Sequence, residues 1–283
     1  MADDMDKLVD LIVKKVKQKI DTKDNTEWAH SVQKDPDGAR RIIDAGASRL
    51  TSGPRIGQVR GDIAPIIDHT MLNPGATHDD LAKLCTEAMD YGFYSVCVNA
   101  ANVSFCRKHL TGTQVKVVAV IGFPLGATSM ESKAFEAKKA VDDGAEEIDM
   151  VINVGALKSR DYTYVIEDIR KVVQTVTPHP VKVIIESAML TNNEKVVASA
   201  LSKAAGAAFV KTSTGFGPGG ATVEDVALIR EVVGPELGVK ASGGIHTADD
   251  VKKMVKAGAT RIGASASVQI VKGGKGRAGR GGY

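Results

Sequence analysis

The sequence predicts an α/β fold, a (β/α)8 TIM barrel preceded by a helical N-terminal extension. From Ile63 onward, short apolar runs rich in β-branched residues alternate with amphipathic helical patterns, which is typical of βα units around a parallel sheet. Eight such runs can be counted, and four helical patterns end in glycine just before a run. A doubly wound open sheet is the alternative, but no GxGxxG fingerprint follows the first expected strand.

The residues before the barrel divide into two parts. In residues 1–21 the apolar side chains recur at steps of three and four, which predicts an amphipathic helix; they are Met5, Leu8, Val9, Ile12, Val13, Val16 and Ile20. Charged residues interrupt this stripe and no small-residue cleavage site follows, so we do not expect a secretory signal. Residues 22–60 are expected to form a polar linker with a short helix near residues 39–45.

The barrel is expected to span residues 61–271. Its strands are predicted at residues 63–68, 94–98, 115–121, 147–152, 181–186, 208–212, 239–241 and 261–264, and helices between them at residues 77–91, 129–143, 162–176, 192–205, 222–233 and 247–257. The glycines that precede four strands are Gly92, Gly144, Gly206 and Gly258. Glycine is expected there because a helix often ends in a left-handed residue. Residues 272–283 are rich in glycine and arginine and predict a flexible basic tail.

Composition and charge exclude several classes of function. Charged residues make up 25% of the chain, and no apolar run approaches the roughly 20 residues that a membrane span needs, so we expect no membrane partner. The formal net charge is only +3, with the basic excess mainly in the termini, which argues against a nucleic-acid partner for the barrel. We therefore expect small molecules or proteins as partners.

The cysteines and histidines indicate the compartment and argue against a metal. Cys85, Cys97 and Cys106 show no paired CxxC spacing, which suits a reducing compartment and predicts a cytoplasmic protein. The six histidines include no HExxH motif and no metal-ligand cluster, so neither a metal nor another cofactor is predicted. His69, beside Asp68, is interpreted as a histidine that is hydrogen-bonded near a strand end.

Lys211 is the residue that the sequence marks most strongly. It closes the apolar run that ends in Val210 and is followed at once by Thr212, Ser213, Thr214 and Gly215, a composition typical of a buried strand that opens into a ligand-binding loop. A lysine in this position is either a salt-bridged structural charge or an amine whose pKa is lowered for chemistry.

Other charged residues are expected at the same end of the barrel. Asp149 lies within the fourth expected strand and Lys240 follows the start of the seventh, next to the strand of Lys211. Two neighbouring ammonium groups lower each other's pKa, and a neutral amine can attack a carbonyl to form a Schiff base, with Asp149 shuttling protons. A buried salt bridge between Asp149 and one lysine is the structural alternative.

The last two βα loops predict a phosphate site. Ser242-Gly243-Gly244-Ile245 follows Lys240, and Gly263-Ala264-Ser265 lies at the last strand. Small residues let backbone N–H groups approach an anion closely, and barrels commonly hold phosphate at these loops.

Seven stretches resemble the motifs of the deoxyribose-phosphate aldolase family. In chain order they are Asp68-His69-Thr70 and residues 95–99, 121–126, 147–153, 182–186, 210–216 and 240–245. The resemblance implies a class I aldolase that reversibly cleaves 2-deoxy-D-ribose 5-phosphate to acetaldehyde and D-glyceraldehyde 3-phosphate through a lysine Schiff base, without a metal. It also implies a homodimer or a larger homo-oligomer.

The resemblance assigns roles to particular residues. Lys211 would be the Schiff-base lysine, Lys240 the second lysine that lowers its pKa, and Asp149 the proton-relay carboxylate. Asp68 and Thr70 would contact the substrate hydroxyl and Cys97 would line the pocket. The expected phosphate-binding residues are Thr214, Gly215, Gly243, Gly244 and Ser265.

Three features depart from this pattern or extend it. Some members carry a lysine where this chain has Phe216 and a serine where it has Ala266, so phosphate would be held more by backbone than by charge. In some members a C-terminal tyrosine enters the active site, which makes Tyr283 a candidate, with a solvated tail as the alternative. The helix of residues 5–20 resembles encapsulation peptides that bind a shell or core protein of a bacterial microcompartment; a lid on the barrel or an oligomer contact are its alternatives.

Two other functions stay open from the sequence. One is another lysine-dependent sugar-phosphate aldolase, of the transaldolase-like kind. The other is a catalytically silent barrel that serves as cargo or scaffold.

Overall fold

The computed structural model describes residues 63–273, together with Lys7, Leu11 and Lys14, which are helical. The remainder of the predicted N-terminal helix, the expected linker of residues 22–60 and residues 274–283, with Tyr283, lie outside the described residues. The domain boundaries predicted there therefore stay predictions.

Eight parallel strands close into a barrel, which confirms the predicted fold. They are β1 (Ile67–Met71), β2 (Ser95–Asn99), β3 (Lys116–Ile121), β4 (Glu147–Val151), β5 (Val181–Ile184), β6 (Phe209–Lys211), β7 (Gly238–Ser242) and β8 (Arg261–Ala264). Each strand pairs with the next one along the chain, and β8 pairs with β1. This order is what repeated βα units produce when a sheet closes on itself.

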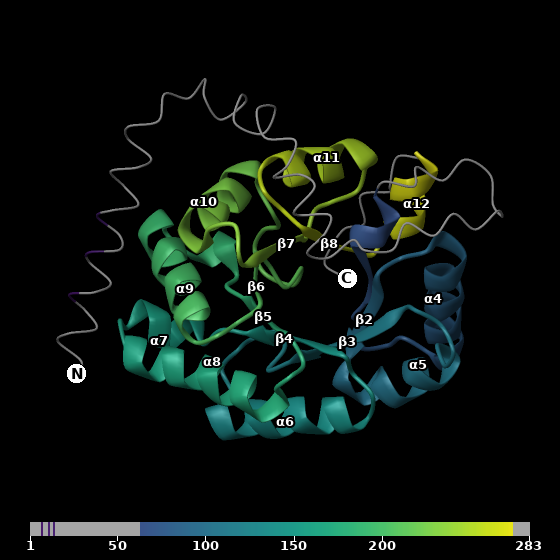
Figure 1. Cartoon of the computed structure of the whole chain (residues 1–283), viewed down its shortest axis with the longest axis horizontal. Coiled ribbons are helices and arrows are strands. Elements are labelled where there is room, and N and C mark those ends of the chain that lie inside the picture. The colour runs from purple at the N-terminus through teal and green to yellow at the C-terminus, as the bar shows by residue number, and fades with distance from the viewer. Residues whose placement is uncertain (1–6, 8–10, 12–13, 15–62, 274–283) are drawn as a thin grey trace.

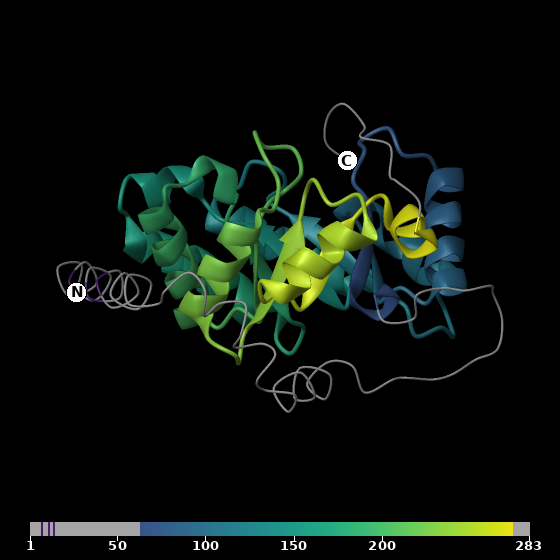
Figure 2. The same cartoon turned by 90° about the horizontal axis from the view of Figure 1, so that it is seen from above.

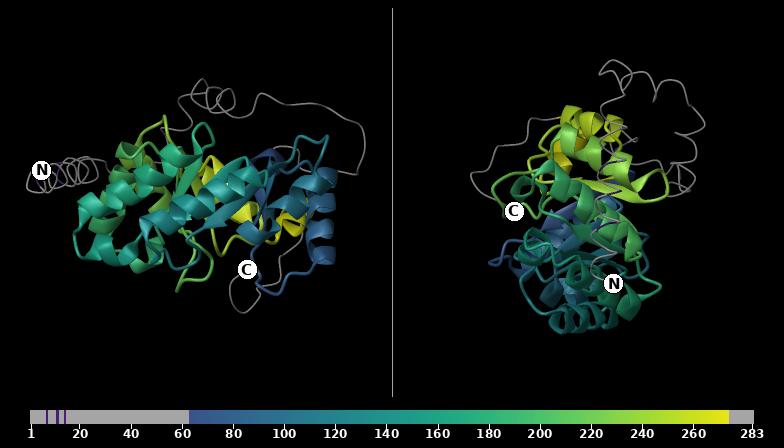
Figure 3. Two further views of the ribbon diagram at one scale, coloured as in Figure 1. Left: turned by 90° about the horizontal axis from the view of Figure 1, so that it is seen from below. Right: turned by 90° about the vertical axis from the view of Figure 1, so that its left-hand side faces the viewer.

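Helices surround the strands as an outer layer (Figure 1). They are α4 (His78–Tyr91), α5 (Val103–His109), α6 (Met130–Asp142), α7 (Val154–Lys158), α8 (Tyr162–Val176), α9 (Asn192–Ala204), α10 (Val223–Val233), α11 (Ala248–Lys256) and α12 (Ser267–Lys272). The views from above and below show the same arrangement from the side of the barrel (Figures 2 and 3). No helix in the described part of the chain has the length and apolar character that crossing a membrane requires.

The helix boundaries follow local capping chemistry. Thr77 caps α4, and its hydroxyl accepts a hydrogen bond from the backbone N–H of Asp80, whose carboxylate accepts one from Thr77 in return. Thr222 and Thr247 cap α10 and α11 in the same way with their hydroxyls. Because a capping residue stands outside its helix, these helices begin one residue later than predicted.

The start of the barrel differs from the prediction. A strand was expected over residues 63–68, whereas Ala64–Ile66 form a 3-10 helix and β1 begins at Ile67. Pro65 explains the difference, because it has no backbone N–H to donate to a neighbouring strand. The short helices α5, α7 and α12 were not predicted, since five to seven residues carry too little periodicity to be recognised.

The barrel interior has an apolar side and an ionic side. Side chains alternate along each strand, so outward residues such as Ile148 and Val210 join the large core under the helices. On the side of β2 and β3 the inward residues form a second apolar cluster that includes Cys97 and Val118. From β4 to β8 the inward positions include six charged side chains, which define the ionic side: Glu147, Asp149, Lys182, Lys211, Lys240 and Arg261.

Candidate active site

Three neighbouring parts of the barrel bring the predicted catalytic side chains together. Asp149 is the middle residue of β4, Lys211 is the last residue of β6 and Lys240 is the middle residue of β7. The strand register places Lys211 directly beside Lys240. All three side chains are buried, with at most 1% of Lys211 exposed. The expected juxtaposition therefore arises from strand order and side-chain alternation alone.

Asp149 is shared by three lysines rather than paired with one. Its Oδ2 accepts hydrogen bonds from Lys211 Nζ at 3.0 Å and from Lys240 Nζ at 2.8 Å. Its Oδ1 accepts a hydrogen bond from Lys182 Nζ at 2.8 Å. The simple salt bridge considered as an alternative is therefore not what the barrel contains. Lys182 was not predicted to be a site residue. A lysine inside a buried strand, as Lys182 is in β5, is the signal that could have identified it.

The three lysines differ in the direction of their pKa shifts. Burial lowers the pKa of Lys211, Asp149 raises it, and Lys240 lowers it further, so that the result lies below the ordinary value. Burial also acts to lower the pKa of Lys240, but Asp149 and Asp68 raise it well above the ordinary value. Lys211 is thus the lysine that most readily becomes a neutral amine, and burial contributes more to this than the second lysine does.

The carboxylate of Asp149 stays ionised. Burial acts to raise its pKa, whereas Lys182, Lys240 and Lys211 lower it, and the pKa lies well below the ordinary value. Because a proton binds it poorly, Asp149 can pass a proton only in concert with a lysine that gives one up.

Asp68, predicted to contact substrate, is held by several groups of the barrel. Its Oδ1 accepts hydrogen bonds from Ser95 Oγ at 2.7 Å and Arg261 Nη1 at 3.0 Å. Its Oδ2 lies 2.5 Å from Lys240 Nζ, in an ion pair without hydrogen-bond geometry. Asp68 is therefore linked to the predicted catalytic side chains by its ion pair with Lys240.

Thr70 and Cys97 line the same interior. The Thr70 hydroxyl donates a hydrogen bond to the carbonyl of Asp68 at 2.9 Å. Cys97 is fully buried, and burial raises the pKa of its thiol, so the side chain is a neutral part of the wall. The contact of Thr70 with substrate and the place of Cys97 in the pocket wall stay predictions.

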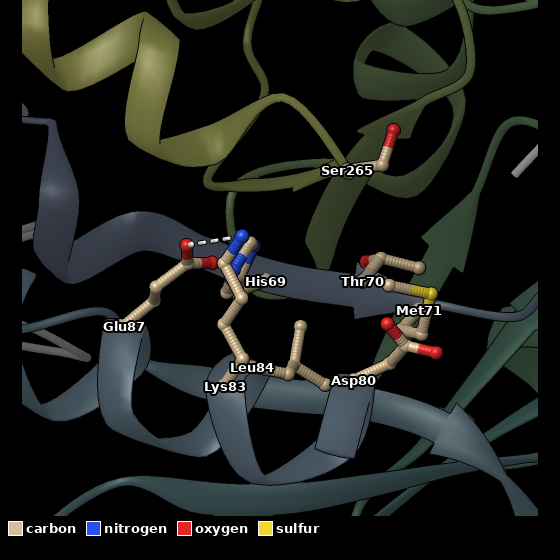
Figure 4. A pocket seen from close by; sticks show the side chains of 8 residues that line it. All are labelled: His69, Thr70, Met71, Asp80, Lys83, Leu84, Glu87 and Ser265. Atoms are coloured by element: carbon tan, nitrogen blue, oxygen red, sulfur yellow. Dashed lines mark hydrogen bonds and ion pairs between the residues drawn. The ribbon is translucent and has the colours of Figure 1, made fainter. Parts of the chain in front are cut away.

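A cavity of about 130 Å³ opens beside the barrel mouth, between β1, α4 and the loop after β8 (Figure 4). Thr70 and Ser265, predicted to contact substrate and phosphate, both line it. His69 lies at its other end, with Nε2 2.9 Å from Glu87 Oε2, which agrees with the predicted hydrogen-bonded histidine. Lys211, the expected nucleophile, is not among the residues that line this cavity.

The predicted phosphate loops pack against each other at the mouth. Gly215, Gly243 and Gly244 have positive φ angles of 89°, 84° and 74°, which glycine adopts without strain. The backbone N–H of Ala221 donates to the carbonyl of Gly243 at 3.0 Å, and a Cβ at Gly220 would lie 2.3 Å from that oxygen. The two loops thus form one backbone surface that only small residues permit.

Glu186 holds the start of the loop after β6, a role that the sequence did not suggest. Its carboxylate accepts hydrogen bonds from the hydroxyl of Thr214 and, at 3.3 Å, from the backbone N–H of the same residue. Glu186 itself has a left-handed backbone with φ 52°. At position 216 this chain has phenylalanine where some family members carry a lysine. The exposed ring of Phe216 packs edge-on against Phe123, with ring centroids 5.4 Å apart. An aromatic pair therefore stands where some members carry a lysine.

The described residues contain no group of three or more His, Cys, Asp or Glu side chains that could hold a metal ion.

Comparison with known proteins agrees with this arrangement. Residues 63–279 match the model of the DeoC/LacD family aldolases. The chain belongs to this family. A deoxyribose-phosphate aldolase from Thermococcus gammatolerans is 59% identical over 216 residues, which are 75% of this chain and 96% of that aldolase. The chain is accordingly an aldolase, a lyase that acts on carbon–carbon bonds.

Solved aldolase structures share the fold. A Coccidioides immitis structure assigned as a deoxyribose-phosphate aldolase has a TM-score of 0.74 and 42% identity, and the match covers 89% of this chain and 98% of that one. The tetrameric deoxyribose phosphate aldolase from Aeropyrum pernix has a TM-score of 0.71 and 34% identity, covering 83% and 97%. The matches include nearly all of each relative.

Proposed function

We propose that this aldolase reversibly cleaves 2-deoxy-D-ribose 5-phosphate to acetaldehyde and D-glyceraldehyde 3-phosphate through a Schiff base on Lys211. The observation that carries the proposal is that Lys211 is a buried amine with a lowered pKa, 3.0 Å from Asp149, at the end of β6. Family membership and the similarity to deoxyribose-phosphate aldolases support the choice of substrate.

The reaction needs a neutral amine and a route for protons. The Lys211 amine attacks the aldehyde carbon of the open-chain sugar phosphate, and loss of water gives an iminium. The bond between C2 and C3 then breaks as the C3 hydroxyl loses its proton, which releases glyceraldehyde 3-phosphate and leaves an enamine. Protonation of the enamine and addition of water release acetaldehyde and restore Lys211. In this proposal Asp149 and Lys240 move these protons, and Asp68, Thr70 and Cys97 contact the sugar.

The phosphate is proposed to bind at the backbone surface of the two loops. Gly215, Gly243 and Gly244 supply N–H groups, and Ser265 adds a hydroxyl from the third loop. Thr214, whose hydroxyl donates to Glu186, holds the start of its loop in position. Phe216 and Ala266 bring no charge there, so we expect binding that depends on hydrogen bonds.

The decisive experiment is reductive trapping. Acetaldehyde and cyanoborohydride should add an ethyl group to one lysine, and peptide mapping should place it on Lys211. Lys133 is the matched control within the chain, because it is also buried and its pKa is also lowered. It differs from Lys211 in lying in α6, outside the strands of the barrel. An adduct at Lys133 or at no lysine would overturn the mechanism and would favour the silent barrel.

The rival aldolase is separated by its donor. A transaldolase-like enzyme would form its Schiff base with a ketose phosphate, whereas the proposed enzyme should be trapped by acetaldehyde and should turn over 2-deoxyribose 5-phosphate. Turnover of a ketose phosphate alone would favour the rival.

We propose that the chain works as a homo-oligomer, a proposal supported by the tetrameric relative from Aeropyrum pernix. Light scattering of the purified chain tests this, and a mass equal to one chain would contradict it.

Residues 5–20 are proposed to dock on a shell or core protein of a microcompartment in the cytoplasm. Their support is the apolar stripe of the sequence and the start of the family match at residue 63, which leaves this segment outside the aldolase barrel. Deleting residues 1–21 should leave soluble, active aldolase that no longer co-purifies with shell proteins. An insoluble or inactive product would contradict this proposal.

A further inference from the structure

Six charged side chains inside the barrel form a closed ring of ion pairs, here called the charge ring. Their signs alternate, and in order around the ring they are Asp149, Lys182, Glu147, Arg261, Asp68 and Lys240. Five strands contribute them, so the ring exists only when the barrel is closed.

One half of the ring lies toward the start of the strands. Lys182 Nζ lies 2.8 Å from Asp149 Oδ1 and 2.6 Å from Glu147 Oε2. Arg261 Nη1 lies 3.1 Å from the same oxygen of Glu147. The guanidinium of Arg261 also lies 3.4 Å from the centroid of the Tyr94 ring, and the Tyr94 hydroxyl donates to Glu147 Oε1 at 2.9 Å. Stacking and hydrogen bonding thus fix both residues of this half.

The other half closes the ring toward the mouth. Arg261 Nη1 lies 3.0 Å from Asp68 Oδ1, and Lys240 Nζ lies 2.5 Å from Asp68 Oδ2. Lys240 Nζ then returns to Asp149 Oδ2 at 2.8 Å. Within the ring, every cation therefore contacts two anions and every anion contacts two cations. Outside the ring, the partly exposed Lys116 Nζ of β3 lies 3.9 Å from Glu147 Oε1.

Lys211 is a seventh charge outside this balance. It lies 3.0 Å from Asp149 Oδ2, an oxygen that Lys240 already occupies, and Asp149 is its only ion pair among the described residues. With every group ionised, the four buried cations exceed the three anions by one. Because the ring is neutral by itself, the excess charge disappears only when one amine loses its proton.

The directions of the pKa shifts agree with this geometry. For Asp68, Glu147 and Asp149, the neighbouring cations outweigh burial and keep the pKa below its ordinary value. For Lys182 and Arg261, the neighbouring anions outweigh burial and raise the pKa. The pKa of Lys240 is raised in the same way. Among these three lysines and the arginine, only Lys211 has a lowered pKa.

We propose that the charge ring selects Lys211 as the reactive amine, and that Glu147, Lys182 and Arg261 act as positioning residues that keep Lys240 and Asp149 ionised. The inference rests on the proposed function, because it explains how the pKa of the Schiff-base lysine is lowered. The titratable groups that act on Lys211 from the other strands are Asp149 of β4, Lys240 of β7 and the Cys97 thiol of β2.

Changing the charge of the ring in opposite directions tests the proposal. Lys182→Met removes a cation from the ring, which should raise the pKa of Lys211. The acid limb of the pH profile, where the trapping rate falls because Lys211 becomes protonated, should therefore move to higher pH by about one unit. Glu147→Gln removes an anion and should move that limb to lower pH by a similar amount. The measurement is the rate of adduct formation at Lys211 with acetaldehyde and cyanoborohydride, each variant compared with the unchanged chain at every pH.

Three further variants separate charge from folding. Lys182→Arg keeps the charge and should leave the limb in place. The double variant Lys182→Met with Glu147→Gln restores a neutral ring and should return the limb toward its original pH, which a folding defect would not do. If Lys182→Met does not fold, Arg261→Gln removes a cation from the same ring and should give the same shift.

The outcomes distinguish this inference from the proposed function. If the unchanged chain forms no adduct at Lys211, the proposed function fails. If the adduct forms but both single variants shift the limb in the same direction, or neither shifts it, the charge ring has no part in selecting Lys211.

Discussion

Two sets of buried charges in this aldolase differ in how they shift the pKa of a lysine: an isolated ion pair and the charge ring. Between α6 and α8, Lys133 Nζ lies 2.5 Å from Asp168 Oδ2, and both side chains are fully buried. Burial outweighs the partner at both ends of this pair, because the pKa of Lys133 is lowered and the pKa of Asp168 is raised. In the charge ring, by contrast, Lys182 and Lys240 have raised pKa values.

The difference indicates that the number of partners decides the direction of the pKa shift. One carboxylate at 2.5 Å does not offset the loss of hydration for Lys133, whereas two carboxylates do so for each ring lysine. Lys211 resembles Lys133 in this respect, because it has a single carboxylate, but that carboxylate belongs to a ring that is already neutral. Only Lys211 combines a lowered pKa with a position at the end of a strand.

The largest expected effect separates the two lysines with lowered pKa by function. Lys211→Met should reduce kcat by at least about 10⁴-fold, because the covalent step has no other nucleophile. Lys133→Met should leave kcat of the folded fraction nearly unchanged. Rates of 2-deoxyribose 5-phosphate cleavage, normalised to folded protein, measure both, and a comparable loss in both variants would mean that the comparison is wrong.

The next effect concerns stability. Lys133→Met leaves the Asp168 carboxyl buried without its partner and should lower the free energy of unfolding by about 3–5 kcal/mol. The double variant Lys133→Met with Asp168→Leu replaces the pair by apolar groups and should recover most of that loss. Urea denaturation followed by circular dichroism measures the difference, and a double variant as unstable as the single one would contradict the argument.

The pH dependence of stability should have opposite contributions from the two sets. The ring carboxyls have lowered pKa values in the folded state, so their stabilisation is present above their ordinary pKa of about 4 and is lost as the pH falls further. Asp168 has a raised pKa, so it favours the folded state as the pH falls through that pKa toward the ordinary value. The double variant without Lys133 and Asp168 should therefore lose stability more steeply on acidification, by up to about 1.4 kcal/mol per pH unit.

Urea midpoints between pH 7 and pH 3 test this contrast. Equal slopes for the unchanged chain and the double variant would show that Asp168 does not titrate as its environment suggests.

The smallest effect sharpens the role of the phosphate loops. Gly217 lies over Glu186, and a Cβ at Gly217 would lie 2.8 Å from the Glu186 carboxyl carbon. Gly217→Ala should displace this carboxylate from Thr214 and raise KM for the phosphorylated substrate by about tenfold or less, the worth of roughly one hydrogen bond. Trapping by acetaldehyde, which has no phosphate, should change little.

Gly155→Ala is the matched control, because a Cβ at Gly155 meets only Asn153 Oδ1 at 3.5 Å. A loss of trapping in Gly217→Ala equal to the loss of phosphate affinity would show that the loop supports Lys211 rather than phosphate.

The sequence by itself determined the barrel and the three catalytic candidates. Alternating strand and helix patterns have local causes, such as threonine caps and apolar periodicity, and parallel strands in chain order place Lys211 beside Lys240 without further information. Asp149 could be included among the catalytic candidates because a carboxylate within a buried strand is expected to face the barrel interior.

Only the tertiary structure decided which charges balance which. Arg261 meets Asp68 across 193 positions of the chain and Glu147 across 114, and nothing local to these residues indicates either contact. The sequence does not show which face of the sheet is occupied by Lys182, Glu147 and Arg261. A shift of one residue in the strand register would turn each of these side chains outward. The closed barrel sets that phase, and with it the neutral ring that leaves Lys211 as the one lysine of the ionic side shifted toward the neutral form.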